Sequence, residues 1–204
     1  MEKLADALDV AGYEVCNLDY PSRHHTVEVL AETHVLPAIA SCFDGPRESI
    51  AFVTHSMGGI LVRQLAATPG RHFDIGRVVM LAPPNGGSEV VDKFGGWRLF
   101  EAINGPAGGQ LGTAADQLPA TLGPAGFELG IVAGNRSINL LLSAVIPGPD
   151  DGKVAIERSK LAGMQDFLLV EVSHPFIMKD EQVISQVISF LKLGAFQREP
   201  DQVK

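Results

Sequence analysis

Ser56 is the residue in this sequence best placed to act as a nucleophile. An apolar run over 51–53 leads into it, Gly58 and a second glycine follow, and residues 60–67 have a helical pattern. A strand, a sharp turn with serine at its tip and a helix form the layout called a nucleophile elbow. Small residues two positions before and after the serine let strand and helix approach closely. Gly58 is small enough, whereas Thr54 is larger than the glycine usual at this position. The alternative to a nucleophile is that Ser56 caps the N-terminus of an ordinary helix.

A serine hydroxyl is a weak nucleophile at neutral pH, so it needs a base, and the base needs an orienting carboxylate. Two of the six histidines follow Ser56. His72 comes one short helix later, with no strand between to return it to the serine, whereas His174 directly follows the apolar run 167–173. We therefore predict His174 as the base. A core or helix-capping histidine before Pro175 is the alternative.

The carboxylate is predicted to be Asp151. It lies in an Asp-Gly-Lys-Val stretch after the predicted strand 127–133. Asp150 is its near rival because both are turn formers, and a plain Pro-Asp-Gly turn is the alternative. Asp166 stands at the start of the last strand, hence at the wrong end of the sheet. Serine, acid and base then follow one another in the order that this kind of fold uses.

The elements that must position these residues alternate along the chain. We predict strands over 13–18, 49–54, 77–81, 127–133 and 167–172, and helices over 2–11, 25–40 (kinked or ended at Pro37) and 182–193. Such alternation predicts a single α/β domain over 1–204, with a mostly parallel sheet flanked by helices. In such sheets the working residues lie at the carboxyl ends of the strands.

Residues 88–124 break this alternation. The region is rich in glycine and proline, and it has short helical patterns around 89–94, 99–103 and 111–118 but no predicted strand. We interpret it as a helical excursion beside the sheet that forms a lid or acyl pocket, lined by the apolar side chains of Phe94, Trp97, Leu99 and Phe100. Ordinary packing over the sheet is the alternative.

Composition excludes several classes of protein. The chain has 204 residues, 46% of them hydrophobic, and a net charge of -8, which disfavours a nucleic-acid partner. No apolar run reaches the roughly 18 residues of a transmembrane segment, and the start lacks a secretory signal. The two cysteines, Cys16 and Cys42, could pair, but we expect two buried thiols in a reduced, cytoplasmic compartment. His24, His25, Glu28 and Glu32 lack the pattern of a metal site, and no cofactor is expected.

Taken together, these motifs resemble those of bacterial α/β-hydrolases of the lipase and esterase type. The matching stretches are 17–22, 54–59, 81–88, 148–154, and Ser173-His174 with 176–178. The resemblance implies Ser56 as nucleophile, His174 as base and Asp151 as its orienter, and it gives the backbone N–H of Met57 to the oxyanion hole. We assign His55, Trp97 and Phe94 to substrate contact.

One part of the family pattern is missing from these 204 residues. Such hydrolases begin with a strand and a His-Gly loop, which supplies the second oxyanion donor, but no His-Gly pair occurs in the sequence. In the family, that strand lies between the strand at 13–18 and the strand that ends at Ser56. We therefore expect either an N-terminally truncated sequence or a rearranged fold, for example by pairing with a second copy.

The function that these observations favour is hydrolysis of a carboxylic ester, either a small molecule or a lipid, through an acyl-enzyme. Acyl transfer to an alcohol other than water would use the same three residues. A binding protein with a decayed site is a third interpretation, supported by the missing loop. Three intact catalytic residue types argue against decay.

Overall fold

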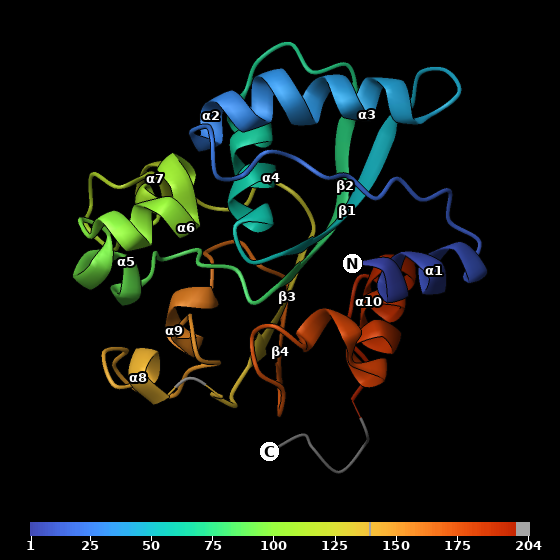
Figure 1. Ribbon diagram of the computed structural model, residues 1–204. Coiled ribbons are helices and arrows are strands. Elements are labelled where there is room, and N and C mark those ends of the chain that lie inside the picture. Colours follow the sequence, from blue (N-terminus) through green and yellow to red (C-terminus); the bar gives the residue numbers. More distant parts are fainter. Residues whose placement is uncertain (139, 199–204) are drawn as a thin grey trace.

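A four-stranded sheet forms the centre of the molecule in the computed structural model, which describes residues 1–138 and 140–198 (Figure 1). The strands follow the order β1-β2-β3-β4, with bounds Ser49–His55, Asp74–Leu81, Leu129–Gly134 and Asp166–Val170. All three pairings are parallel. The carboxyl ends of the strands therefore meet at one edge of the sheet, where the sequence predicted the chemistry.

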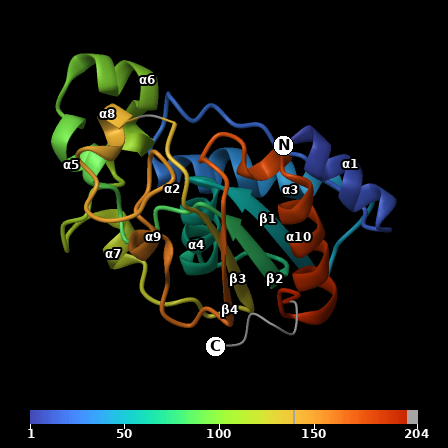
Figure 2. The ribbon, with the colours of Figure 1, turned by 90° about the horizontal axis from the view of Figure 1, so that it is seen from below.

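Helices cover both faces of the sheet (Figures 1 and 2). One face packs against α1 (Glu2–Val10) and α10 (Glu181–Leu193), whose apolar side chains share a core with Val79 and Leu81 of β2. The other face carries α4 (Gly58–Ala67), which buries Val62 against Val78 and Met80. A strand that is buried on both faces reads as a continuous apolar run, and the end of β2 does so.

The helix predicted over 25–40 continues past its proline instead of ending there. It comprises α2 (Val27–Val29), the π-helical segment η1 (Leu30–Val35) and α3 (Leu36–Cys42). Pro37 has no backbone N–H to donate to the preceding turn. The wider π turn ends at Leu36, whose N–H donates to the carbonyl of Ala31, so the proline falls at the start of a new α-helix.

The segment predicted as a strand over 13–18 is not one. It runs from α1 toward α2 without a β-ladder, because no strand lies beside it among the described residues. The expectation of two free thiols is also wrong: Cys16 of this segment and Cys42 at the end of α3 form a disulfide, with their Cα atoms 6.0 Å apart. The disulfide ties the unpaired segment to the helical layer.

The excursion over 88–124 contains α5 (Glu89–Phe94), α6 (Arg98–Gly109) and α7 (Leu118–Thr121), and no strand is described in it. The helix predicted over 111–118 is wrong, because only α7 begins at its end. Gly105, with a φ of 67°, interrupts α6 where the backbone of Arg23 passes against it. The remaining short helices are α8 (Leu140–Ser143), α9 (Ile156–Ser159) and the 3₁₀ turn η2 (Ile177–Lys179). Among the described residues, no helix is long and apolar enough to cross a bilayer.

Candidate active site

Ser56 lies at the tip of the turn between β1 and α4, at the carboxyl end of the strand. Its φ is +53°, in the left-handed region that residues other than glycine seldom adopt. Its backbone N–H donates to the carbonyl of Leu81 in β2 at 2.9 Å, and its carbonyl accepts from Gly59 at 3.0 Å. A Cβ on Gly58 would lie 3.2 Å from the Cβ of Thr54, so the turn leaves little room there. These contacts hold the serine in its strained conformation.

His174 links Ser56 to Asp151 through two hydrogen bonds. Its Nε2 lies 3.1 Å from the Oγ of Ser56, and its Nδ1 lies 2.7 Å from Oδ2 of Asp151. An ionised carboxylate only accepts hydrogen bonds, so Nδ1 carries the proton and Nε2 is free to accept from the serine hydroxyl. The histidine is 7% exposed and the aspartate 2%, which shields this relay from water.

The loops after β3 and β4 position the acid and the base. The backbone N–H of His174 donates to the carbonyl of Asp151 at 2.9 Å, which joins the two loops directly. Oδ1 of Asp151 accepts from the backbone of Lys153 at 3.0 Å and of Val154 at 2.9 Å. The carboxylate is therefore held from both sides, with one oxygen bound by its own loop and the other presented to the imidazole.

The alternative candidates for the acid and the base do not contact Ser56, His174 or Asp151 through their side chains. Asp150 accepts from the hydroxyl of Ser143 and from the backbone N–H of Gly152, so it stabilises the loop instead of touching His174. His72 lies two residues before the start of β2, at the edge of the sheet opposite Ser56. Asp166 begins β4 and pairs with Arg198. The structure thus brings together the three residues that the sequence favoured and separates the alternatives from them.

His55 lies beside His174 and contacts its backbone. The Nε2 of His55 is 3.0 Å from the carbonyl oxygen of His174, and the two ring centroids are 4.8 Å apart. Burial, together with the nearby His174, lowers the pKa of His55 to about 3. The ring is therefore neutral near pH 7 and can donate its Nε2 proton to that carbonyl. Its predicted role in substrate contact stays a prediction, and in this structure it fixes the position of His174.

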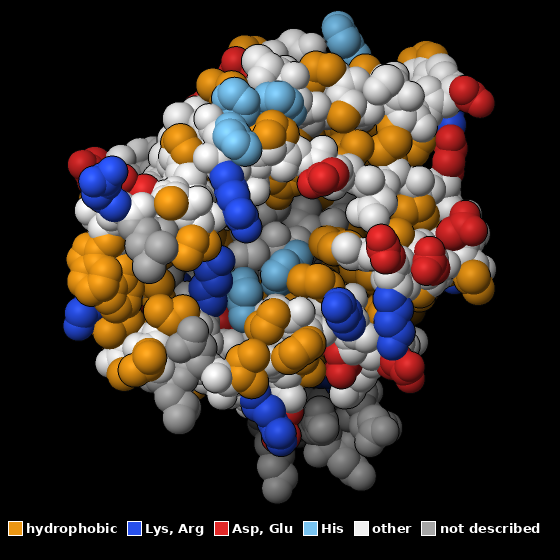
Figure 3. Space-filling model, viewed as in Figure 1, with side chains coloured by type: hydrophobic (Ala, Val, Ile, Leu, Met, Phe, Trp, Pro, Cys, Tyr) orange, Lys and Arg blue, Asp and Glu red, His pale blue; other side chains and the backbone are white. Residues whose placement is uncertain are grey.

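The backbone N–H of Met57 has no hydrogen-bond partner within the part of the chain that the structure describes. It stands at the N-terminus of α4, where the helix dipole favours negative charge. A cavity of about 1030 Å³ reaches Ser56, Met57 and Gly58. The surface around this region is hollowed, with histidine side chains inside the hollow and lysine or arginine side chains on its rim (Figure 3).

The apolar residues assigned to substrate contact lie in the excursion. The rings of Phe94 and Trp97 meet edge to face at 5.0 Å, and Trp97 is 61% exposed. Phe94 and Phe100 pack against the small core around Val90, while the side chain of Leu99 lies outside the described residues. Neither Phe94 nor Trp97 lines the cavity at Ser56. Their role in substrate contact remains a prediction.

Sequence reasoning gave no role to Tyr20, which lies close to the turn at Ser56, or to the buried Arg63 of α4. The hydroxyl of Tyr20 lies 3.7 Å from the position that a Cβ on Gly58 would occupy, and burial, with a smaller contribution from Asp19, raises its pKa. Arg63 is buried in α4, and burial lowers its pKa to about 10. The sequence signal for Arg63 was a single arginine within an otherwise apolar helix. Tyr20 belongs to the stretch 17–22 that carries the family resemblance, but no role was predicted for it.

The histidines near the amino end do not form a metal centre with their neighbours. The rings of His25 and His34 lie 4.9 Å apart, but no group of three His, Cys, Asp or Glu side chains suited to a metal ion occurs over 1–138 and 140–198.

Comparisons with solved structures identify the fold. The chain superposes on a Bacillus licheniformis lipase, BlEst2 in its propeptide form, with a TM-score of 0.62 and 19% identity, covering 88% of this chain and 43% of that one. It superposes on the Legionella pneumophila phospholipase PlaB, in complex with thio-NAD, with a TM-score of 0.68 and 16% identity, covering 95% and 55%. No protein-family model and no curated protein matches the chain.

The fold is therefore that of α/β-hydrolases, as the sequence predicted. The chain spans about half the length, or less, of these two lipolytic proteins. At such low identity the superposition supports the fold and leaves the reaction to be argued from the site.

Proposed function

We propose that this protein is a serine hydrolase that cleaves carboxylic esters. The observation that carries the proposal is the chain of contacts Ser56–His174–Asp151, with N–O distances of 3.1 and 2.7 Å, at the carboxyl edge of a parallel sheet. Such a constellation is recognised by its geometry and by the roles of its members. The similarity of the fold to a lipase and a phospholipase supports an ester or lipid as substrate.

In the proposed reaction, Nε2 of His174 takes the proton of the Ser56 hydroxyl as Oγ attacks the ester carbonyl carbon. The carbonyl oxygen gains negative charge, and the N–H of Met57 donates to it. The carbon–oxygen bond to the alcohol then breaks, and His174 returns the proton to the leaving alkoxide. Water, deprotonated by the same imidazole, releases the acid from the serine. Asp151 holds the ring and stabilises the imidazolium.

The oxyanion hole has one donor among the residues described. A second donor commonly supplements the backbone N–H that follows the nucleophile, and loss of one donor costs about 10²–10³ in rate. With one donor identified among the described residues, we expect slow hydrolysis of esters.

We further propose that the excursion over 88–124 acts as an apolar lid. Trp97 and Ile103 of this excursion are large apolar side chains that are more than half exposed, and so are Ile138 and Leu141 at α8. Exposed apolar groups of this kind favour an acyl chain or a lipid aggregate over a small polar ester. Acyl-chain selectivity should change in Trp97→Ala, whereas a merely packed region would leave it unchanged.

The test is hydrolysis of short-chain p-nitrophenyl esters by the chain and by Ser56→Ala, with circular dichroism to show that both are folded. We expect slow release of nitrophenol that disappears in the variant. Equal rates in the two proteins would show that Ser56 is not the nucleophile. Adding an alcohol and analysing the products separates hydrolysis from the acyl transfer that the same residues could perform.

A further inference from the structure

Lys153 is a cation at the tip of the loop that carries the proposed acid. Asp150 and Ala155 form an isolated β-bridge that closes this loop. Inside it, the N–H of Asp151 donates to the carbonyl of Val154 at 3.3 Å. Lys153 lies within this tight turn, two residues after Asp151. The proposed reaction does not use its side chain.

Both polar backbone groups of Lys153 are held in place. Its N–H donates to Oδ1 of Asp151 at 3.0 Å, and its carbonyl accepts from the hydroxyl of Ser88 at 3.0 Å. The same carboxylate contacts His174 through its other oxygen. The backbone of Lys153 therefore has a fixed position relative to the proton relay, and its side chain starts from a defined point beside the site.

The side chain of Lys153 has no partner of opposite charge. In the described part of the chain it forms no ion pair, whereas Lys160 of the next turn pairs with Glu157. The residue as a whole is exposed, yet burial around its ammonium group lowers the pKa of Lys153, against the opposing effect of Asp151. Lysine usually keeps its ammonium group in water, and a charge that loses water without a partner is costly. An anion from outside the chain would supply that partner.

The charge of Lys153 is felt at the histidines beside Ser56. Burial and the nearby His174 lower the pKa of His55 most, and the charge of Lys153 adds to this lowering. Exposed charges act on one another only over short distances, because salt screens them within about 10 Å. The ammonium group therefore lies near the paired histidine rings, whose centroids are 4.8 Å apart. Figure 3 shows lysine or arginine side chains on the rim of the hollow that contains histidine side chains.

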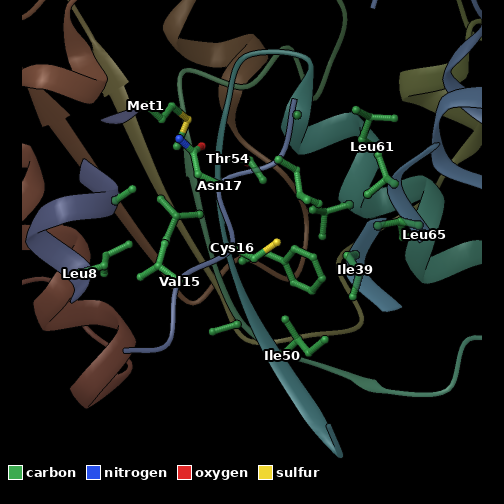
Figure 4. Close-up of a pocket in the computed structure, with 18 of the residues that line it drawn as sticks. Met1, Leu8, Val15, Cys16, Asn17, Ile39, Ile50, Thr54, Leu61 and Leu65 are labelled. Atoms are coloured by element: carbon green, nitrogen blue, oxygen red, sulfur yellow. The ribbon is translucent and has the colours of Figure 1, made fainter. Parts of the chain in front are cut away.

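The other side of Ser56 is apolar. The cavity of about 1030 Å³ that reaches Ser56 and Met57 is a slot between β1 and residues 13–20. Its lining is largely apolar and includes Leu8, Val15, Ile39 and Leu61 (Figure 4). Neither His174 nor Lys153 lines this slot, and β2 to β4 lie on the opposite side of β1. Ser56 thus stands between an apolar cavity and a cationic group.

The proposed reaction determines which part of an ester would approach Lys153. Nε2 of His174 returns a proton to the leaving alkoxide, so the alcohol part of the substrate must lie against this imidazole. A negatively charged group on the alcohol part would then come within reach of the ammonium group and form a charge-assisted hydrogen bond. The net charge of -8 repels anions from the molecule as a whole, so a local cation matters more for such a substrate.

We propose that Lys153 selects esters whose alcohol part carries a negative charge, either a phosphate or a carboxylate. The proposal rests on the proposed hydrolysis of esters at Ser56. Lys153 acts in binding and not in the chemical step, because it pairs with the anion while the alcohol oxygen faces His174. The expected signature is a lower KM for an anionic ester than for its neutral counterpart, with a similar kcat.

The experiment measures kcat and KM on two matched pairs of esters. The first pair is p-nitrophenyl butyrate and the same ester with a carboxylate on the nitrophenyl ring. The second pair is monobutyrin and butyryl glycerophosphate. We expect Lys153→Gln to lower kcat/KM about tenfold for the anionic member of a pair, through KM, and to leave the neutral member unchanged. The pair that responds identifies the anion as a carboxylate or a phosphate.

Two further variants control for the charge and for its position. Lys153→Arg keeps the charge and should retain most of the preference for the anionic ester. Lys192→Gln removes an exposed lysine at the far end of α10 from the loop of His174, and it should leave the preference unchanged. Added salt should weaken the preference of the wild type, because it screens the attraction.

Two kinetic results would overturn the proposal. An equal loss on the neutral and the anionic ester would show that Lys153 only supports the loop of Asp151. Unchanged kinetics of Lys153→Gln on all four esters would show that this side chain does not contact the substrate.

A binding measurement separates this proposal from the hydrolysis itself. Glycerol phosphate or hydroxynitrobenzoate, the anionic products of the two pairs, is titrated into Ser56→Ala while the amide NMR signals of residues 152–154 are followed. We expect saturable shifts that disappear when Lys153→Gln is added to this background. If the wild type and Ser56→Ala hydrolyse the neutral esters equally, the hydrolase proposal fails and these shifts still test the anion site. If hydrolysis depends on Ser56 but no shift occurs, only the role of Lys153 is wrong.

Discussion

The two edges of β1 are built very differently. On one edge, β2 pairs with it in parallel from Ser49 to His55, and the N–H of Ser56 continues the contact to Leu81. On the other edge lies a slot of about 1030 Å³, and across it the backbone of residues 14–19 has no hydrogen-bond partner in the part of the chain that the structure describes. The strands and loops that position the proton relay are on the first side, and the N–H of Met57 lies at the end of the slot.

This difference separates two requirements of the proposed reaction. Orientation of the nucleophile and the base depends on β1 to β4 and the loops that follow them, and the described residues already provide it. Stabilisation of the developing oxyanion is assigned to the N–H of Met57, which lines the slot. The two can therefore be perturbed one at a time.

The largest effect is expected on the side of the proton relay, at the two neighbouring aspartates Asp150 and Asp151. Asp151→Asn should lower kcat/KM for p-nitrophenyl esters by about 10⁴-fold, because an amide favours the wrong imidazole tautomer. Asp150→Asn is the matched control, since its carboxylate contacts Ser143 and Gly152 and not His174. It should cost less than about tenfold. The account of the relay fails if the two variants lose activity equally while both remain folded.

The next effect concerns the buried arginine that fastens the excursion to α4. The guanidinium of Arg63 donates to the carbonyls of Asn85, Pro119 and Gly123 at 3.0, 2.7 and 2.8 Å. Removing it in Arg63→Ala leaves these acceptors without their donor, and we expect a loss of about 4 kcal/mol in the free energy of unfolding.

Urea denaturation measures this loss. Arg71→Ala is the control, because the one side-chain hydrogen bond of Arg71 in the described chain goes to the carbonyl of Ala66. It should lose about 1 kcal/mol. Similar losses in the two variants would show that Arg63 does not fasten the excursion.

On the side of the slot, a disulfide ties the segment that faces β1 to the end of α3. Cys16 and Cys42 are 26 positions apart, and a cross-link closing a loop of this size stabilises by about 3 kcal/mol in the chain-entropy account. Cys16→Ser should therefore lower the urea midpoint and speed amide exchange in Tyr13–Tyr20. The amide exchange rates of β2 to β4 should stay unchanged. Uniform acceleration across β2 to β4 would mean that the two sides are not independent.

The smallest effect is a pH dependence from His55. Its pKa is 6.5 in the unfolded chain and about 3 in the folded protein, so between these values only the unfolded state binds the proton. Above pH 6.5 the residue contributes no pH dependence. As the pH falls from 6.5 to 5, stability is lost by up to about 1.4 kcal/mol per pH unit, or about 2 kcal/mol in all.

The variant His55→Asn removes this proton binding. Its urea-derived free energy of unfolding should fall less steeply than that of the wild type between pH 6.5 and 5. If the free energy of unfolding falls equally steeply with pH in the variant and the wild type, His55 is not buried in its neutral form. A loss of kcat without a change in KM in the same variant would show that His55 positions His174 instead of binding substrate.

The sequence predicted those parts of the molecule whose structure depends on neighbouring residues along the chain. The apolar run before Ser56, the glycines after it and the order of the three polar residues identified the turn and the fold class. Asp151 could be preferred over Asp150 but not separated from it, because the choice depends on which carboxylate the loop turns toward His174. That choice is made by the N–H groups of Lys153 and Val154, which bind one oxygen of Asp151.

The predictions that were wrong concern segments whose structure depends on residues far away in the sequence. Residues 13–18 have the pattern of a strand, but a ladder needs a neighbour, and no described strand lies beside them. Their extended course carries Cys16 within bonding distance of Cys42, a proximity that spacing along the chain could not reveal. The helix expected over 111–118 failed because that stretch passes through turns that pack against α5, with Thr113 bound to Asp92.

The most direct test of the central claim is covalent labelling of the protein with a fluorophosphonate, followed by peptide mapping. This reagent reports the activated serine itself, whether or not the oxyanion hole is complete. We predict one adduct, on Ser56, formed at least 100-fold more slowly in His174→Ala. An adduct on a different serine, or labelling of Ser56 that is equally fast without His174, would contradict the account.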